Sequence, residues 1–240
     1  MNVALVFAGG AGIRMNSKAK PKQFLELNGK EILVYTLEVF EKHPEIDKIV
    51  VVCLEDWIDY TKKLIKRYEL EKVVSVVKGG KNTQESQYIG LREIASWNKK
   101  DVIVLIHDGV RPLIDFDTIT RNIEGVKKYG SAITVTEAIE TIVYVDQDET
   151  MNDVIDRKKC RMAKAPQSYY LKDVLEVHHR AISDGNLEYI DSACMMQDYG
   201  IKIHTVEGNE DNIKITTPKD FYLFRAILEA KENSQIWGIN

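Results

Sequence analysis

Residues 1–15 read MNVALVFAGGAGIRM, an apolar run followed by three glycines. The apolar residues 3–7 stop at Gly9 and Gly10, a pattern typical of a short buried strand. Because glycine has no side chain, the loop after the strand can approach a ligand closely and direct several backbone N–H groups towards it. The pattern therefore predicts a strand of a buried sheet that leads into an anion-binding loop.

Similar apolar runs return along the chain and alternate with segments of helical spacing. Further strands are predicted at residues 48–54, 73–77, 102–106 and 132–135, and helices at 32–40, 57–68, 84–97, 116–129, 171–184 and 218–232. The alternation predicts an α/β fold with a mostly parallel, Rossmann-like sheet and helices on both faces. In such sheets the ligand crevice lies beyond the carboxyl ends of the strands.

Residues 140–170 interrupt this alternation. Residues 141–145 alternate between apolar and polar, residues 146–149 form a polar turn, and residues 153–160 follow. We expect a hairpin-like β-arm that projects from the sheet, inserted at about residues 140–165. No glycine- or serine-rich linker separates it, so the prediction is a single domain of residues 1–240.

Composition excludes several classes of protein. The chain has 240 residues and a formal net charge of -4, so no basic field is available to hold a nucleic acid. Its three cysteines are not spaced for a zinc site or a disulfide framework, and such sparse cysteines suit a reducing cytoplasm. No stretch approaches the roughly 20 apolar residues of a membrane helix, and the first residues do not resemble a signal peptide. We therefore expect a cytoplasmic protein with neither a membrane nor a nucleic-acid partner.

The first polar cluster follows the opening strand. Arg14 and Lys22 add positive charge beside the glycines, so the cluster predicts a polyphosphate site. The alternative is a glycine-rich turn with two solvated cations. A dinucleotide-binding fingerprint would need a third glycine where Met15 stands, and the Gly-Lys-Ser/Thr of a P-loop is absent from the sequence.

Two more clusters follow later strands. Residues 79–86 can hold a nucleotide base against backbone groups, or can be a capped turn between strand and helix. In the cluster 107–112, Asp108 can hold a metal ion or a substrate hydroxyl, and Arg111 can pair with a phosphate. The alternative for Asp108 and Arg111 is a structural ion pair, and His107 is assigned no chemical role. Arg157 and Lys214, taken singly, are most often surface charges.

Together the clusters resemble a known family, the cytidylyltransferases of the methylerythritol-phosphate and ribitol-phosphate type. The resemblance extends from residue 3 to about residue 220. The opening glycine motif with Arg-Met appears at 9–15, and Pro-Lys-Gln appears at 21–23. The motif His-Asp-x-x-Arg-Pro appears at 107–112, and Asp-Asn-Ile-Lys appears at 211–214.

The resemblance implies a nucleotidyltransferase that uses CTP and Mg²⁺ and acts on a small polyol phosphate. Arg14 and Lys22 would be catalytic and stabilise charge on the reacting phosphates. The residues implied to bind CTP are Ala8, Gly9, Gly10, Ala11, Gly12, Gly80, Lys81 and Ser86. Those implied to bind the acceptor are Asp108, Arg111, Thr141, Arg157 and Lys214, and Asp108 is also the candidate magnesium ligand. The segment at 140–165 resembles the dimerisation arm of the family, which implies a homodimer with Arg157 in the partner's site.

The motifs are closer to the ribitol branch of that family. The methylerythritol branch typically reads Pro-Ala-Ala-Gly in the first loop and Ala-Ala-Arg-Pro in the third, where this chain has Phe-Ala-Gly-Gly and Gly-Val-Arg-Pro. The expected acceptor is therefore D-ribitol 5-phosphate, with CDP-ribitol and pyrophosphate as products, which implies teichoic-acid or capsule biosynthesis. The alternative is 2-C-methyl-D-erythritol 4-phosphate, in isoprenoid biosynthesis. Alternatives from other classes are a nucleotide-binding module without turnover and a nicotinamide oxidoreductase.

Replacing Arg14 or Lys22 with alanine is expected to lower kcat much more than it weakens CTP binding. Both cations stand beside the predicted polyphosphate loop, where they would face negative charge that grows in the transition state. The loss of such a donor costs about 10²- to 10³-fold in kcat. Steady-state kinetics with varied CTP separates the two parameters, and near-normal turnover of both variants would contradict the assignment.

Overall fold

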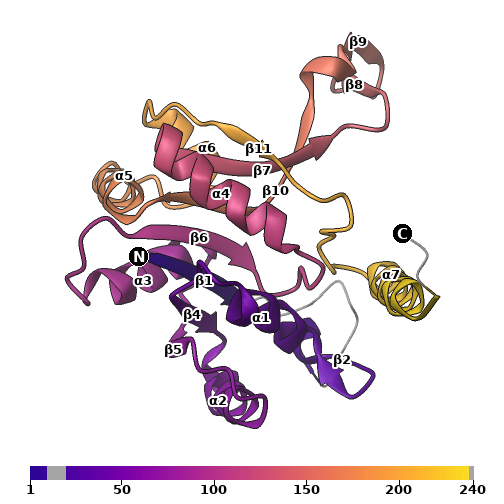
Figure 1. Ribbon diagram of the computed structural model, residues 1–240. Coiled ribbons are helices and arrows are strands. Elements are labelled where there is room, and N and C mark those ends of the chain that lie inside the picture. Colours follow the sequence, from indigo (N-terminus) through magenta and orange to yellow (C-terminus); the bar gives the residue numbers. More distant parts are fainter. Residues whose placement is uncertain (10–19, 238–240) are drawn as a thin grey trace.

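The computed structural model describes residues 1–9 and 20–237, with side chains described to residue 233, around a seven-stranded sheet (Figure 1). The strand order is β11-β7-β10-β6-β1-β4-β5. The strands are β1 (Asn2–Ala8), β4 (Lys48–Cys53), β5 (Val73–Lys78), β6 (Ile103–Asp108), β7 (Ser131–Glu137), β10 (Arg161–Tyr170) and β11 (Thr205–Glu207). Every neighbouring pair is parallel except the two that β10 forms, so the expected mostly parallel sheet is confirmed.

Helices cover both faces of the sheet. The apolar cluster on one face includes residues of α1 (Ile32–Lys42), α2 (Ile58–Arg67) and α4 (Phe116–Tyr129). The cluster on the other face includes residues of α3 (Thr83–Ala95), α5 (Leu171–Ser183) and α6 (Ser192–Asp198). Helix α7 (Pro218–Trp237) packs through Phe224 on a third, smaller cluster. In the described part of the chain, no helix combines the length and the apolar character needed to cross a membrane.

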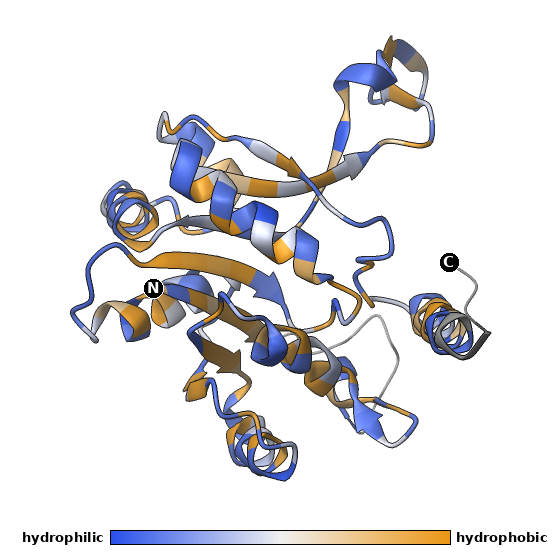
Figure 2. Cartoon of the chain, in the orientation of Figure 1, coloured by the Kyte–Doolittle hydropathy of each residue, from blue (hydrophilic) through white to orange (hydrophobic). Residues whose placement is uncertain are grey.

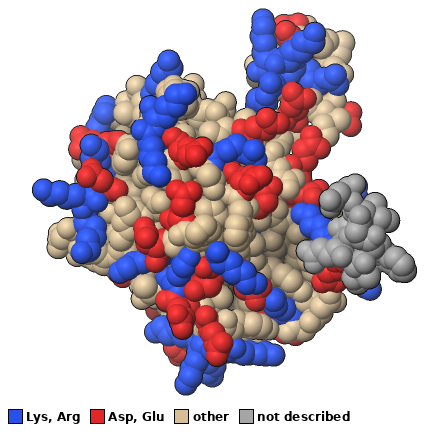
Figure 3. All heavy atoms as spheres, viewed as in Figure 1, with Lys and Arg blue, Asp and Glu red and all other residues tan. Residues whose placement is uncertain are grey.

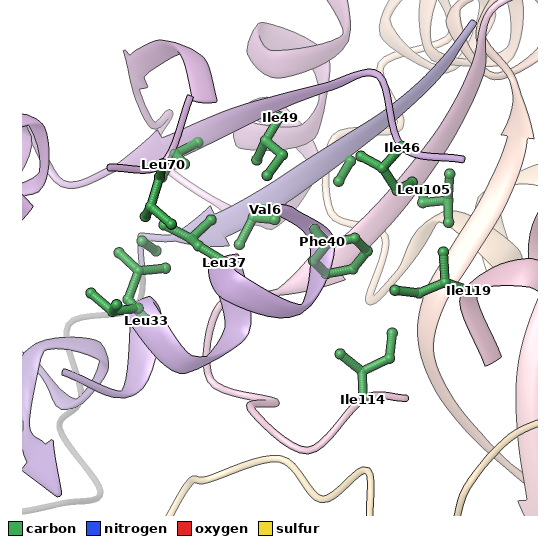
Figure 4. Packing of buried hydrophobic residues seen from close by; sticks show 14 of the residues in the cluster. Val6, Leu33, Leu37, Phe40, Ile46, Ile49, Leu70, Leu105, Ile114 and Ile119 are labelled. Carbon is green, nitrogen blue, oxygen red and sulfur yellow. The ribbon is translucent and has the colours of Figure 1, made fainter. Parts of the chain in front are cut away.

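Side-chain alternation along β1 explains why both faces are apolar. Ala4 and Val6 belong to the cluster on one face, whereas Val3 and Leu5 belong to the cluster on the other. Figure 2 shows the result as apolar colour along the strands and polar colour on the outer side of α4. The close view in Figure 4 shows Phe40 of α1 among the side chains of this core. Phe40 is fully buried, and burial of such a side chain contributes about 1.5–3 kcal/mol.

Strand β10 corrects one expectation. Residues 140–170 were expected to leave the sheet, but residues 161–170 form a strand between β7 and β6. Ser168 pairs with Leu105 of β6 on one side and with Ala132 of β7 on the other. The segment carries a proline and polar residues where a buried strand is usually apolar, so its periodicity gives no strand signal. Pairing along both edges makes it a strand.

The segment before β10 forms a separate hairpin. Strands β8 (Ile142–Val145) and β9 (Met151–Ile155) pair with each other and belong to a sheet of their own. Figure 1 shows this hairpin extending away from the body of the molecule. Several of its apolar side chains are exposed, including Tyr144, Val145, Met151 and Val154. Its role as a dimerisation arm stays a prediction.

The remaining elements are short. They are β2 (Glu26–Leu27), β3 (Lys30–Glu31) and the 3₁₀ helices η2 (Lys22–Phe24), η3 (Glu55–Trp57) and η4 (Arg157–Lys159). Strands β2 and β3 pair only with each other in the described chain. Helix η2 directly precedes this pair and contains the predicted catalytic Lys22.

Gly90→Ala is expected to lower the free energy of unfolding although it sits inside a helix. A Cβ at Gly90 would lie 2.5 Å from Cδ1 of Leu5 and 2.8 Å from Cγ2 of Val52. Overpacking of this kind costs about 1–3 kcal/mol. The higher helix propensity of alanine offsets only about 1 kcal/mol of that cost.

Urea denaturation of the parent, Gly90→Ala, Leu5→Ala and the double variant measures this effect. The Leu5→Ala substitution removes the methyl groups that a Cβ at Gly90 would meet. Gly90→Ala should therefore lower the free energy of unfolding less in the Leu5→Ala background than in the parent. A Gly90→Ala variant more stable than the parent would show that the helix and the sheet are not in such close contact.

Candidate functional site

A pocket of about 510 Å³ lies where the carboxyl ends of β1 and β6 meet the loop after β5. This is the edge of the sheet at which the sequence predicted a ligand crevice. The charged residues that line it in the described chain are Lys22, Lys81, Asp108, Arg111, Lys164, Asp191 and Lys214. Five cations and two carboxylates give the lining a positive balance within a chain of net charge -4. The pocket therefore suits an anionic ligand.

Asp108 forms the centre of the charged group at the end of β6. Its Oδ2 accepts a hydrogen bond from Nε of Arg111 at 2.8 Å, and its Oδ1 accepts one from Nζ of Lys214 at 2.8 Å. Burial by itself would raise the pKa of Asp108, but Lys214 and Arg111 hold that pKa well below its usual range. The carboxylate therefore stays ionised and fixes both cations. Desolvation lowers the pKa of the neighbouring His107 to about 4, which keeps its imidazole neutral at neutral pH.

The segment that carries Lys214 reaches the site through long-range hydrogen bonds. Arg111 donates from Nη1 to the carbonyl oxygen of Asn212 at 2.9 Å. The fully buried Asn212 donates from Nδ2 to the carbonyl oxygen of Ala165 in β10 at 2.6 Å. Ile215 N–H adds a bond to the carbonyl of Val110 at 2.9 Å. These bonds bring the motifs at 107–112 and 211–214, far apart in the sequence, to one end of the pocket.

The loop between β5 and α3 contributes Gly80, Lys81 and Ser86. Gly80 N–H donates to Oγ of Ser86 at 3.0 Å, and Lys81 N–H donates to Oε2 of Glu85 at 2.6 Å. A Cβ at Gly80 would collide with the side chain of Glu85, so only glycine fits this tight turn. Asn82 caps α3, because its Oδ1 accepts a hydrogen bond from Glu85 N–H at 2.9 Å. The loop is thus a structured edge of the pocket.

The predicted catalytic residue Lys22 also lines the pocket. It begins η2, whose next residue, the buried Gln23, donates from Nε2 to the carbonyl of Ala8 at 2.6 Å. The following Phe24 stacks on Trp57 with ring centroids 4.6 Å apart. The first contact holds η2 against the end of β1, and the second holds it against η3.

Several predicted CTP-binding residues belong to the first loop. Ala8 is the buried last residue of β1, and Gly9 follows it at the pocket, where no atom of the described residues lies within 4 Å of a Cβ placed on Gly9. The predicted catalytic residue Arg14 and the predicted CTP-binding residues Gly10, Ala11 and Gly12 lie outside the described residues.

Two residues predicted to bind the acceptor substrate do not line the pocket of their own chain. Thr141 and Arg157 are exposed, and neither lines the pocket. Arg157 donates from Nη1 to the carbonyl oxygen of Ile139 at 2.7 Å, next to the hairpin. Asp108, Arg111 and Lys214 are therefore assembled within one chain, whereas Thr141 and Arg157 are not.

The polar lining residues that were not predicted from the sequence include Lys164, Gln167 and Asp191. Lys164 and Gln167 come from β10, and Asp191 is the N-cap residue of α6. Gln167 donates from Nε2 to Oδ2 of Asp191 at 3.1 Å. Since residues 161–170 carry no periodic strand signal, nothing local indicated that their side chains face a pocket.

The donor set allows a magnesium ion only together with a phosphate ligand. Within the described chain, no group of three or more His, Cys, Asp or Glu side chains could hold a metal ion. Asp108 is the single predicted ligand, and both of its oxygens carry an ion pair. Mg²⁺ usually binds through one or two carboxylates plus phosphate oxygens and water, and a bound nucleotide would supply those phosphates.

Comparison with known proteins gives consistent matches over nearly the whole chain. A model of the family "2-C-methyl-D-erythritol 4-phosphate cytidylyltransferase" matches residues 2–230. The ribitol-5-phosphate cytidylyltransferase of Vibrio parahaemolyticus is 52% identical over 99% of this chain and 100% of its own length. One from Streptococcus agalactiae is 49% identical over 100% of both chains. The 2-C-methyl-D-erythritol 4-phosphate cytidylyltransferase of Clostridium novyi is 38% identical over 95% of this chain and 96% of its own.

A solved structure shows the same fold. The crystal structure of 4-diphosphocytidyl-2C-methyl-D-erythritol synthase from Anaerococcus prevotii superposes with a TM-score of 0.82 at 25% identity. The match covers 95% of this chain and 96% of that one.

Proposed function

Because this chain belongs to the 2-C-methyl-D-erythritol 4-phosphate cytidylyltransferase family, we propose that it transfers CMP from CTP to D-ribitol 5-phosphate. The products are CDP-ribitol and pyrophosphate. The family resemblance and the class of CTP-dependent nucleotidyltransferase expected from the motifs are thereby confirmed. The choice of ribitol 5-phosphate as the acceptor rests on one observation, a comparison of sequence identities. Identity is 52% to a ribitol-5-phosphate enzyme over the full length, against 38% to a methylerythritol-phosphate enzyme.

The chemistry needs positioning and charge stabilisation rather than a nucleophile from the protein. A phosphate oxygen of the acceptor attacks the α-phosphorus of CTP, the bond to the β-phosphate breaks, and pyrophosphate leaves. The attacking oxygen is already anionic, so no general base has to activate it. The remaining requirement is to hold two anions in line and to stabilise the charge that develops between them.

The residues of the pocket fit these tasks. Arg111 and Lys214 would hold the acceptor phosphate, and Asp108 keeps both in place through its two ion pairs. Lys22, which begins η2 and lines the pocket, would stabilise charge on the reacting phosphates together with Arg14. The loop at Gly80, Lys81 and Ser86 would receive the nucleotide. Each task follows from the family pattern and, for the described residues, from their position in the pocket.

A magnesium ion would accompany CTP and neutralise part of the charge on its triphosphate. Asp108 is the proposed protein ligand, and the protein keeps this carboxylate ionised at all physiological pH values because the folded state depresses its pKa. The described residues supply too few oxygen donors there to hold the ion tightly.

The working form is proposed to be a homodimer joined through the hairpin. The hairpin exposes the apolar side chains of Tyr144, Val145, Met151 and Val154 and is too small to bury them alone. Figure 3 shows Lys and Arg side chains gathered on this projecting part, which includes Arg157, Lys158 and Lys159 of η4. Thr141 and Arg157 lie outside the pocket of their own chain, so a partner could receive them. A cytoplasmic location, where CTP is made and thiols stay reduced, fits this proposal.

Ribitol 5-phosphate is expected to be used better than 2-C-methyl-D-erythritol 4-phosphate. A site built to hydrogen-bond a substrate hydroxyl rejects an analogue that lacks it strongly, because its own polar groups are left unpaired. A pocket that only accommodates a methyl group discriminates by about 10- to 200-fold. Values of kcat/KM for both acceptors at saturating CTP test the proposal. A higher value for the methylerythritol phosphate would assign the protein to the other acceptor.

Activity is expected to require a divalent ion that the free protein does not retain. Dialysis against EDTA should abolish pyrophosphate release, and added Mg²⁺ should restore it. Metal analysis of the protein after gel filtration without nucleotide should find less than one ion per chain. Full turnover after exhaustive chelation would refute the requirement.

Mixing two inactive variants is expected to restore activity if Arg157 acts in the partner's site. In a heterodimer of Arg157→Ala with Lys214→Ala, one of the two sites would contain both native side chains. Rates of the mixture, compared with each variant alone, test this contribution. Sedimentation of the double variant Val145→Glu, Met151→Glu tests the interface, with Ile182→Glu on α5 as an exposed control. Absence of complementation, together with an intact dimer of the hairpin variant, would place the interface elsewhere.

A further inference from the structure

Lys164 is a lysine of the pocket to which neither the motifs nor the family pattern assigns a role. It lies on β10 between two other lining residues, Ala163 and Ala165, and its side chain is half-buried. Its Nζ donates to the carbonyl oxygen of Glu210 at 2.8 Å. An ammonium group has three hydrogens to donate, so this single bond leaves donors for a ligand.

Within the described chain, the ammonium group of Lys164 forms no ion pair with a carboxylate. Burial lowers the pKa of Lys164, and the nearby Arg111 lowers it further, while Glu210 and Asp211 act in the opposite direction. Among the described residues, Arg111 and Lys214 pair with Asp108, but no carboxylate lies within ion-pair distance of Lys164. Arg111 and Lys214 therefore share the carboxylate of Asp108, and Lys164 adds a third cation, on which Glu210 and Asp211 act without forming an ion pair among the described residues.

Hydrogen bonds connect Lys164 to the acceptor side of the pocket. The bond from Lys164 to Glu210 and the bond from Asn212 to Ala165 both join β10 to the segment that carries Lys214. Arg111 donates to the carbonyl of the same Asn212. One set of hydrogen bonds thus connects the segments that carry Lys164, Arg111 and Lys214. The loop at residues 79–86 does not take part in these bonds.

We propose that Lys164 binds the phosphate of the acceptor directly, as a third cation beside Arg111 and Lys214. The inference rests on the proposed function, since it takes a phosphomonoester as the second substrate. Such a group carries about 1.5 to 2 negative charges near neutral pH and three acceptor oxygens. Three cationic donors, of which Arg111 and Lys214 pair with Asp108, match both its charge and its oxygens, which gives Lys164 a part in selecting a phosphorylated polyol.

The test compares Lys164→Met with Lys164→Arg in the full-length protein. Initial rates are measured with varied ribitol 5-phosphate at saturating CTP, and with varied CTP at saturating acceptor. Loss of one charged hydrogen bond should raise the KM for the acceptor about 10- to 100-fold in Lys164→Met. The KM for CTP should change less than about 2-fold, and Lys164→Arg should recover most of the acceptor affinity because it keeps the charge.

Lys63→Met is the matched control. Lys63 is exposed on α2 and does not line the pocket, so this variant removes the same charge without touching the site. It should leave both KM values unchanged. Thermal unfolding of all variants separates ligand binding from the alternative role of Lys164 as a tether for residue 210. Equal rises in both KM values with a lower Tm would overturn the proposal in favour of that tether.

The two proposals fail in different ways. If the parent uses ribitol 5-phosphate and Lys164→Met has an unchanged KM for it, the role of Lys164 is refuted and the function stands. If the parent uses only the methylerythritol phosphate, the proposed acceptor is refuted. The same KM comparison with that acceptor then decides the role of Lys164, because both acceptors are phosphomonoesters.

Discussion

Strand β10 joins the two parts of the central sheet by pairing antiparallel with β6 along one edge and with β7 along the other. A buried hydrogen-bond network holds it in register. Ser168 donates to Oδ1 of Asn122 at 2.9 Å, and Asn122 donates to Oγ1 of Thr134 at 2.8 Å. Thr134 in turn donates to the carbonyl of Pro166 at 2.8 Å. A buried polar group that loses its partner costs about 1–3 kcal/mol, so the network strongly favours one register.

The pocket depends on that register. A shift of one residue would move all the side chains of β10 relative to β6 and β7 and would therefore replace the residues of β10 that line the pocket. With the observed pairing, Lys164 and Gln167 line the pocket. The carbonyl of Ala165 receives Asn212, whose own carbonyl receives Arg111. The position of Arg111 is therefore coupled to the sheet through β10 as well as through β6.

Electrostatics explains how like charges can be held together before a ligand arrives. Arg111 and Lys214 each donate to one oxygen of Asp108, which depresses the pKa of the carboxyl group and keeps it charged. The carboxylate offsets their mutual repulsion and also orients them. Donors that are already fixed need little reorganisation when charge develops on a substrate, and such preorganisation is the main source of electrostatic catalysis. An acidic chain can thus present a locally positive pocket without a basic surface.

Local patterns in the sequence were sufficient for most of the sheet and for the identity of the family. Short apolar runs ended by glycine or polar residues gave β1, β4, β5, β6 and β7, because strands buried on both faces need apolar residues throughout. The motifs gave Lys22, Asp108, Arg111 and Lys214 as site residues, and all four line the pocket. Only the tertiary structure placed β10 in the sheet and Lys164 in the pocket. The pairing of β10 depends on hydrogen bonds to β6 and β7 and on a polar network with α4. These contacts join residues far apart in the chain, so the local pattern of apolar and polar residues cannot predict them.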